Sequence, residues 1–365
     1  MTSLKTPAHR EEVAPVSASV PPKPKSSARD PYFDNAKYLA IILVAAGHSW
    51  EPLPDSGRIV AAAYAFVYTF HMPVFILISG YLSRSFDLRP DRAWRLVATL
   101  VVPYAIFEVA YTLFERVFGD SSFPLSPTDP YWLLWFLPAL FIWRLTTPIW
   151  QALRWPVPVS LGIAVVGAMG HGIGGDLQLE RVLQFLPFYV LGMRLRPHHF
   201  ELLRNTRVRL AAIPVCAVAL LAAYWTEPRM NHAWFFRSSN AQDLGAPFWV
   251  GGIMTLALFG CALVLGGCFF AWVPGRRLWI TALGAGTLYG YLLHGFVIRG
   301  ANYLGWYDDL TVLGTPLGRV TVTLAAIAVV TLLCTPPVRR VFRFVVEPPL
   351  GWAARRNGTE GTSRA

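Results

Sequence analysis

Residues 37–48 of the chain read KYLAIILVAAGH, and this stretch decides how the rest of the sequence is interpreted. It predicts a hydrophobic helix with Lys37 at one end and His48 at the other. At about 100° per residue the separation between them is about 20° past three full turns, so both side chains lie on one face. They are roughly 16 Å apart along the axis, about half the hydrocarbon thickness of a bilayer. One helix face can therefore join a membrane surface to a buried histidine.

The composition is that of an integral membrane protein. Of the 365 residues, 54% are hydrophobic and 15% are charged, whereas soluble domains carry about 25% charged residues. The net charge of +11 would suggest nucleic acid in a soluble protein, but here the positive-inside rule accounts for it, and we expect no nucleic acid partner. The four cysteines lie in apolar runs without zinc-like pairing, so we expect neither a metal site nor a disulfide framework.

Ten apolar segments of membrane-spanning length predict an all-α, polytopic membrane helix bundle of about ten transmembrane helices. They lie near residues 36–52, 59–82, 96–114, 131–150, 157–173, 179–195, 209–226, 247–272, 278–298 and 317–337. The expected membrane domain covers 33–345. Residues 1–32 have no apolar core and are expected to form a disordered cytosolic tail without a cleavable signal peptide. Residues 346–365 are expected to form a second cytosolic tail.

Basic residues indicate which loops face the cytoplasm. If the N-terminus is cytoplasmic, the inner loops receive most of the arginines, whereas the outer loops hold scattered cations mixed with aspartates. Both termini are therefore predicted to be cytoplasmic, in a multi-pass protein of the plasma membrane. The arginines of the inner loops are Arg84, Arg89, Arg92, Arg95, Arg154, Arg194, Arg196, Arg204, Arg207, Arg209, Arg276 and Arg277.

Three histidines and a carboxylate are predicted at a similar depth in different helices, namely His48, His71, Glu108 and, somewhat further out, His294. Charged groups at a helix centre in the bilayer cost at least about 2.5–3.5 kcal/mol, so each needs a reason. A neutral histidine can accept the proton of an attacking hydroxyl, and a carboxylate on its other ring nitrogen would fix its tautomer. We therefore interpret His48 as a catalytic base.

The partner of His48 remains open among Glu108, His71 and Glu51. Glu51 follows His48 by three residues and reaches it only if the helix continues past Ser49. The alternative is that one or more of the buried groups only form hydrogen bonds between helices. Metal binding by the three histidines is disfavoured because no two of them share a helix at ligand spacing.

Arginines mark a second candidate site at the inner face. Arg92 and Arg95 are three residues apart, so they are neighbours on one helix face and can hold phosphates bidentately. Arg144 extends this site toward the histidines. Anchoring to lipid headgroups is the alternative for such arginines, although Arg144 lies deeper than an anchor requires. Ser79 and Gly80 can admit a substrate chain, or close helix packing explains them.

Aromatic residues cluster at the predicted outer face, in YWLLWFLPAL. Trp132 and Trp135 fit an interfacial belt, or a platform on which a sugar stacks. At the other end, Asp34 and Lys37 are three residues apart at the entrance of the first helix. A local ion pair is the plain explanation of both.

Several stretches together resemble the acyltransferase 3 family of multi-pass membrane acyltransferases, most closely its fucose 4-O-acetylase-like members. The resemblance implies that His48 is the essential histidine of the first helix and that Lys37 takes the place of its basic partner, often an arginine. Lysine keeps the positive charge but lacks the planar guanidinium group with which arginine donates two parallel hydrogen bonds. Arg92 and Arg95 are similar to the family's paired arginines on the side where the acyl-coenzyme A donor binds. The stretches, in order, are FDNAKYLAIILVAAGHS, FHMPVFILISGYLS, DRAWRL, PYAIFE, YWLLWFLPALFIWRL, FLPFYVLGMRLR and TALGAGTLYGYLLHGFVIR.

The sequence and this resemblance predict a membrane-bound O-acyltransferase that moves an acetyl group from acetyl-coenzyme A (acetyl-CoA) to a hydroxyl of a sugar, glycan or glycosylated metabolite. The alternative, from another class, is a glycan or glycolipid transporter or flippase whose buried histidines relay protons. Expected partners are the acyl donor, a carbohydrate-type acceptor and the lipid bilayer. The assigned residues are His48, Glu108 and His71 for catalysis, Lys37, Arg92, Arg95 and Arg144 for the donor, and Ser79, Trp135 and His294 for the acceptor.

Overall fold

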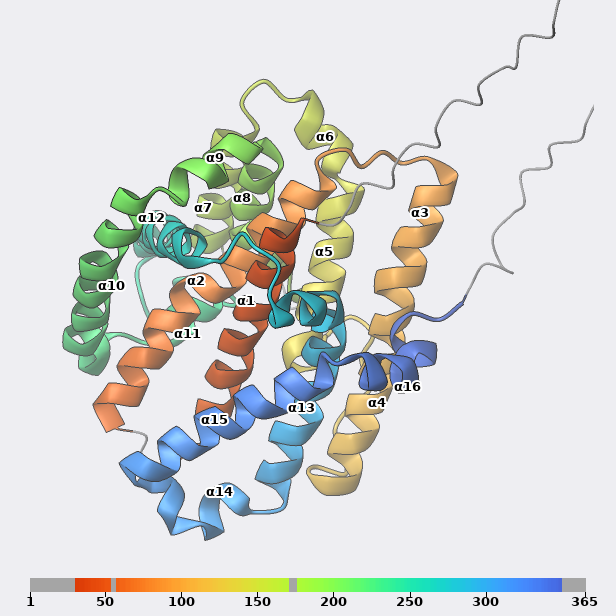
Figure 1. The fold of residues 1–365 in the computed structure, drawn as a ribbon, viewed down its shortest axis with the longest axis vertical. Helices are drawn as coiled ribbons and strands as arrows, with labels where there is room; N and C mark the ends of the chain where they lie inside the picture. The colour runs from red at the N-terminus through yellow and green to blue at the C-terminus, as the bar shows by residue number, and fades with distance from the viewer. Residues whose placement is uncertain (1–29, 54–56, 171–175, 350–365) are drawn as a thin grey trace, which may run out of the picture. The chain divides into compact units, whose positions relative to one another are not determined.

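The computed structural model describes residues 30–53, 57–170 and 176–349. These residues form helices joined by loops, with no strand among them (Figure 1). Each of the ten apolar segments contains a helix, and the predicted all-α membrane bundle is confirmed. Most of the two predicted tails, residues 1–29 and 350–365, lies outside the described residues.

The bundle is built from long helices and shorter connecting ones. The long helices are α1 (Pro31–Trp50), α2 (Gly57–Ser83), α4 (Val102–Phe118), α7 (Pro156–Met169), α8 (Leu179–Arg194), α10 (Thr206–Thr226), α12 (Phe248–Trp272), α13 (Thr287–Tyr303) and α15 (Pro316–Leu333). The shorter ones are α3 (Pro90–Leu96), α5 (Phe136–Leu145), α6 (Thr147–Ala152), α9 (Pro197–Leu203), α11 (Ala233–Phe236), α14 (Trp306–Asp309) and α16 (Pro336–Val346). A π-helical segment, Val97–Val101, joins α3 to α4, and 3₁₀ segments at Trp132–Trp135 and Trp279–Gly286 lead into α5 and α13.

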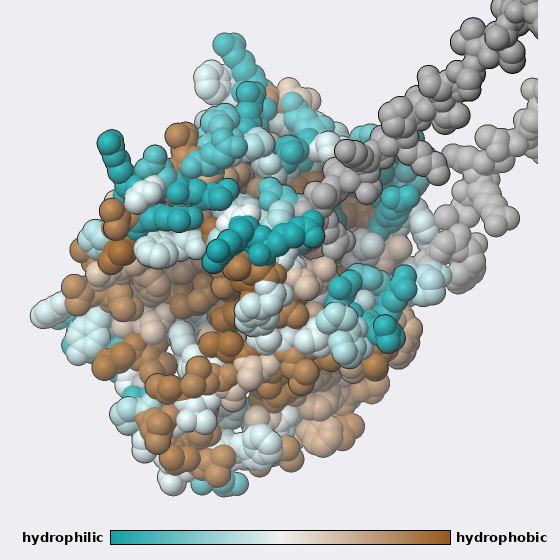
Figure 2. Space-filling model, viewed as in Figure 1, coloured by the Kyte–Doolittle hydropathy of each residue, from teal (hydrophilic) through white to brown (hydrophobic). Residues whose placement is uncertain are grey.

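Five helical stretches in the described residues are long and apolar enough to cross a membrane. Large apolar side chains are exposed along α10, α12 and α15, which is the surface expected where helices face lipid rather than water. Figure 2 shows hydrophilic side chains gathered at the top of the view, where Figure 1 places α6 and α9, and hydrophobic ones below them. The chain is a helical membrane protein. The five stretches are Gly57–Ser83, Pro90–Phe118, Thr206–Arg229, Phe248–Trp272 and Pro316–Leu333.

Helix α1 lies inside the bundle, where it packs against α2, α13, α15 and the 3₁₀ segment before α13 (Figure 1). Ala36, Ala40 and Ala45 are fully buried on it. Small side chains let neighbouring helices approach closely in a membrane, where tight packing and hydrogen bonds hold helices together. The packing fixes the directions in which Lys37 and His48 project.

Helices α2 and α8 cross at two glycines. A Cβ atom on Gly80 would collide with the carbonyl oxygen of Tyr189, and one on Gly192 would collide with that of Leu77. The two backbones are therefore in direct contact, which glycine alone permits. Close packing thus explains Gly80, whereas its neighbour Ser79 lines a cavity.

One predicted helix, 131–150, is divided in the structure. It consists of the 3₁₀ segment, α5 and α6, with a break at Thr146, where ψ is −1°. The physical reason is Pro148, which has no N–H and cannot continue the hydrogen-bond ladder of a helix interior. The predicted helix 96–114 begins earlier than expected, at Pro90, because proline is well suited to the first turn.

Candidate active site

His48 and His294 form a hydrogen-bonded pair between α1 and α13. Nδ1 of His48 lies 3.0 Å from Nε2 of His294, and the two rings are 15° from parallel. His294 is 1% exposed, whereas His48 is partly exposed and reaches a cavity. The residue assigned from sequence to the acceptor is thus the hydrogen-bond partner of the assigned base.

The hydrogen bonds of His294 determine the tautomers of both rings. Its Nδ1 lies 2.9 Å from the carbonyl oxygen of Gly290 and 2.8 Å from that of Tyr291. Carbonyl oxygens only accept, so Nδ1 of His294 carries the proton and its Nε2 accepts. His48 must then donate through Nδ1. When His48 is neutral, its Nε2 therefore has a lone pair, and the described residues provide no hydrogen-bond partner for it.

The other candidate partners of His48 are bonded elsewhere. The carboxylate of Glu108 accepts the backbone N–H of Tyr131 at 2.9 Å. His71 places Nδ1 2.9 Å from the carbonyl oxygen of Val67. The structure therefore places an imidazole, rather than a carboxylate, on Nδ1 of His48.

Glu51, which follows α1, holds an aromatic cluster together. It accepts hydrogen bonds from the hydroxyls of Tyr64 (3.2 Å) and Tyr68, and from Nε1 of Trp132 at 3.2 Å. None of these bonds involves His48. Glu51 therefore acts on the surroundings of the base, through the tryptophan that packs against His48.

Trp132 forms one wall of the site. The centroid of its ring lies 4.6 Å from the ring centroid of His48. The guanidinium of Arg299 lies 4.5 Å from the ring centroid of Trp132. The backbone φ of Trp132 is 36°, in the left-handed region, which costs a non-glycine residue about 1–3 kcal/mol. Contacts on both sides hold this conformation. Trp132 and Trp135 line the His48 cavity, where the belt interpretation had placed them against lipid.

The cavity that His48 lines is small, about 60 Å³. Its polar lining includes His71, Tyr68 and Arg181, among apolar and aromatic side chains. Since one water needs about 10–15 Å³ on the same measure, the cavity holds a few waters or one small acyl group.

A second cavity of about 270 Å³ adjoins the first, and both are lined by Val44 and Met72. It brings together three residues assigned to substrates, Lys37, Ser79 and Arg144. The two cavities run along α1 from Lys37 to His48, on the face that the spacing predicts.

Two hydrogen-bonding contacts hold the basic groups of the second cavity. Nζ of Lys37 forms the expected ion pair with Asp34, at 2.7 Å. Nε of Arg144 donates to the hydroxyl of Ser83 at 3.1 Å. Lys37 is thus held by a carboxylate one turn earlier on α1, and Arg144 by a hydroxyl at the end of α2.

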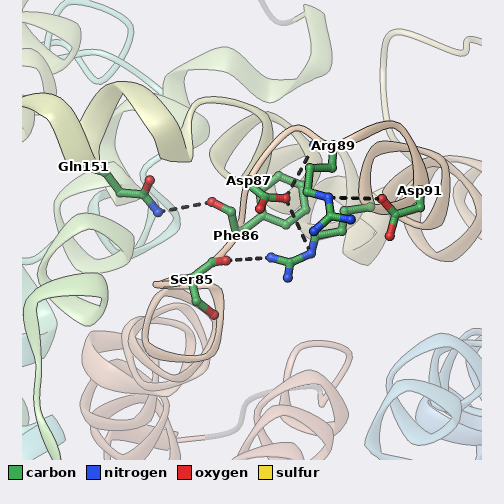
Figure 3. Close-up of polar contacts among 7 residues, drawn as sticks. Ser85, Phe86, Asp87, Arg89, Asp91 and Gln151 are labelled. Atoms are coloured by element: carbon green, nitrogen blue, oxygen red, sulfur yellow. Dashed lines mark hydrogen bonds and ion pairs between the residues drawn. The ribbon is translucent and has the colours of Figure 1, made fainter.

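Arg92 and Arg95 lie outside both cavities. Arg92 binds the loop before α3, where it donates to the carbonyl oxygen of Ser85 at 2.8 Å and lies 3.4 Å from the carboxylate of Asp87. Figure 3 shows this loop, with a second ion pair between Arg89 and Asp91. Arg95 is exposed. The structure thus separates these arginines from the cavity that contains Arg144.

A third cavity, of about 390 Å³, also adjoins the His48 cavity. Glu51, Tyr64, His232 and Phe236 line it, and Phe236 also lines the His48 cavity. The His48 cavity thus adjoins one cavity that includes Lys37 and another that includes Glu51.

Arg181 was not singled out from the sequence. It lies in the first turn of α8 and lines the His48 cavity. The available signal was an arginine inside a predicted membrane span, 179–195, which calls for an explanation on energetic grounds. Because many arginines of the predicted inner loops are explained by the positive-inside rule, Arg181 did not stand out among them.

Comparison with known proteins shows the family of the chain. An acyltransferase domain family matches residues 30–335, so the chain belongs to that family and is an acyltransferase of the membrane. It is similar to nodulation protein NolL of Sinorhizobium fredii (strain NBRC 101917 / NGR234), with 28% identity over 316 residues, covering 77% of this chain and 83% of the relative. No solved structure matches the chain. The acyltransferase resemblance is confirmed at the level of the family.

Proposed function

We propose that this acyltransferase moves an acetyl group from acetyl-CoA to a carbohydrate hydroxyl in the plasma membrane, with Nε2 of His48 as the general base. The observation that carries the proposal is the ordered pair of histidines. His294 accepts the Nδ1–H of His48, which leaves a lone pair on Nε2 of a ring that lines the cavity. A neutral imidazole held in one tautomer is suited to accept a proton near neutral pH.

The donor enters from the cavity that contains Lys37 and Arg144. These cations attract the phosphates of the coenzyme, and the pantetheine arm extends along α1 toward His48. Arg92 and Arg95 add positive charge at the same cytoplasmic end. The small volume beside His48, about 60 Å³, favours acetyl over longer acyl groups.

The acceptor approaches from the third cavity. Its lining of a carboxylate and aromatic rings, including Glu51 and Tyr64, suits a sugar, which offers hydroxyl groups and apolar ring faces. The acceptor oxygen attacks the thioester carbonyl while Nε2 of His48 takes its proton. The C–S bond then breaks, and the departing sulfur takes that proton from His48. His294 stabilises the intermediate imidazolium by accepting its Nδ1–H.

The proposal is tested with the purified protein in lipid nanodiscs, radiolabelled acetyl-CoA and a panel of mono- and oligosaccharides. We expect labelled esters with wild type and with His198→Ala, a control for an exposed histidine. His48→Ala should lower the rate by about 10²- to 10⁴-fold, the usual contribution of a general base. A wild-type rate for His48→Ala, with the variant correctly folded, would exclude His48 as the base.

A further inference from the structure

Arg181 is a cation in the wall of the His48 cavity that forms no direct ion pair with the described residues, and the carboxylate of Glu51 acts on it only through space. Its guanidinium lies 5.2 Å from the ring centroid of Trp135. Its Nε is buried without a hydrogen-bond partner, and it forms no ion pair with the described residues. A buried charge without a partner is costly. The resting protein therefore retains a buried cation that no described residue pairs with directly, and a group that enters the cavity can bind it.

The hydrogen-bond donors of the cavity are otherwise nearly all in use. His48 donates to His294, and His71 donates to the carbonyl oxygen of Val67. The hydroxyl of Tyr68 donates to Glu51. In the described lining, Arg181 and the neutral indole N–H of Trp135 keep donors that no protein group accepts.

We propose that Arg181 binds the oxygen of the acetyl carbonyl and stabilises the oxyanion that forms when the acceptor attacks. The inference rests on the proposed acetyl transfer and adds a second catalytic residue to it. As the acceptor oxygen bonds to the carbonyl carbon, the C=O π electrons move onto the carbonyl oxygen, and the guanidinium donates to it. When the C=O bond re-forms, the C–S bond breaks and the oxygen loses its negative charge.

The position of Arg181 favours this role. Arg181 and His48 line the same cavity of about 60 Å³. An acetyl group fits there, so the guanidinium and the proposed base lie beside the same reacting carbonyl. The ring of Trp135 lies beside the guanidinium of Arg181. The hydrogen-bond donors of Arg181 are therefore oriented before substrate arrives. Preorganised donors of this kind act mainly on the transition state.

The test compares Arg181→Gln and Arg181→Lys with Arg237→Gln, all in nanodiscs. Arg237 is a matched control because it is buried over Phe185 and Phe188 but does not line the cavity. We expect Arg181→Gln to lower kcat by about 10²- to 10³-fold, as loss of one oxyanion donor does. KM for acetyl-CoA and for the acceptor should change little, and Arg181→Lys should recover part of kcat. Arg237→Gln should lower the melting temperature without lowering kcat.

Three outcomes would overturn the inference. A raised KM for the acceptor with unchanged kcat would assign Arg181 to ground-state binding. Equal losses of kcat in Arg181→Gln and Arg237→Gln, each matching a loss of thermal stability, would make both structural. If Arg181→Gln does not fold, Arg181→Met keeps the length of the side chain without a hydrogen-bond donor, and a wild-type kcat in that variant would overturn the inference. Absence of acetyl transfer by wild type would contradict the proposed function instead, so the two failures are distinguishable.

Discussion

Replacing His294 by alanine tests the tautomer argument. The substitution removes the acceptor of the His48 Nδ1–H bond, which is 3.0 Å long and becomes charge-assisted when His48 is protonated. Hydrogen bonds to charged groups contribute about 1.5–3 kcal/mol. At about 1.4 kcal/mol per factor of ten, the loss predicts a fall in kcat of roughly 10- to 150-fold. This fall is smaller than the one expected for His48→Ala, because the base itself remains.

The assay is the initial rate of acetyl transfer in nanodiscs, with folding monitored by the melting temperature. His294→Gln is the informative companion, because the amide oxygen of glutamine can accept the Nδ1–H of His48 and should recover part of the rate. His198→Ala controls for the loss of a histidine at an exposed position. A wild-type rate in well-folded His294→Ala would refute the reasoning. A fall as deep as that of His48→Ala would instead make His294 part of the proton transfer itself.

Two further predictions concern the donor cavity and the helix crossing. Lys37→Ala and Arg144→Ala should each weaken coenzyme A binding by roughly 10- to 150-fold, the loss of one charged hydrogen bond. The control Arg154→Ala, at an exposed position, should not weaken it. Calorimetric titration measures the affinity, and a wild-type affinity in Lys37→Ala and Arg144→Ala would contradict the assignment. Gly80→Ala should lower the free energy of unfolding by about 1–3 kcal/mol through overpacking. The control Gly162→Ala should not lower it, because a Cβ atom there meets nothing within 4 Å. A Gly80→Ala protein as stable as wild type in denaturation assays would be inconsistent with direct backbone contact.

Much of the fold could be predicted because spanning length and apolar content are local properties of the chain. The break at Thr146 was missed, although Pro148 was a readable signal for it. The placement of Lys37 and His48 along one helix face follows from helical geometry, and both residues line adjoining cavities on that face.

The partners in the site could not be predicted, because helix packing decides them. His48 and His294 are 246 residues apart, and their depths alone did not reveal that they touch. Glu108 lies at a suitable depth, yet its carboxylate accepts the backbone N–H of Tyr131. No pattern local to α4 specifies that choice. The role of Arg181 likewise depends on the cavity, which is lined by residues of several helices that are far apart in the sequence.

The most direct test of the central claim uses a deletion strain of the source organism, complemented with wild type or with His48→Ala. Mass spectrometry of its surface glycans and exported metabolites shows whether acetyl esters are present, and membrane levels of both proteins are measured alongside. We predict that acetylated species vanish on deletion, return with wild type and stay absent with equally abundant His48→Ala. Return of those species with His48→Ala would contradict the assignment of His48 as the general base.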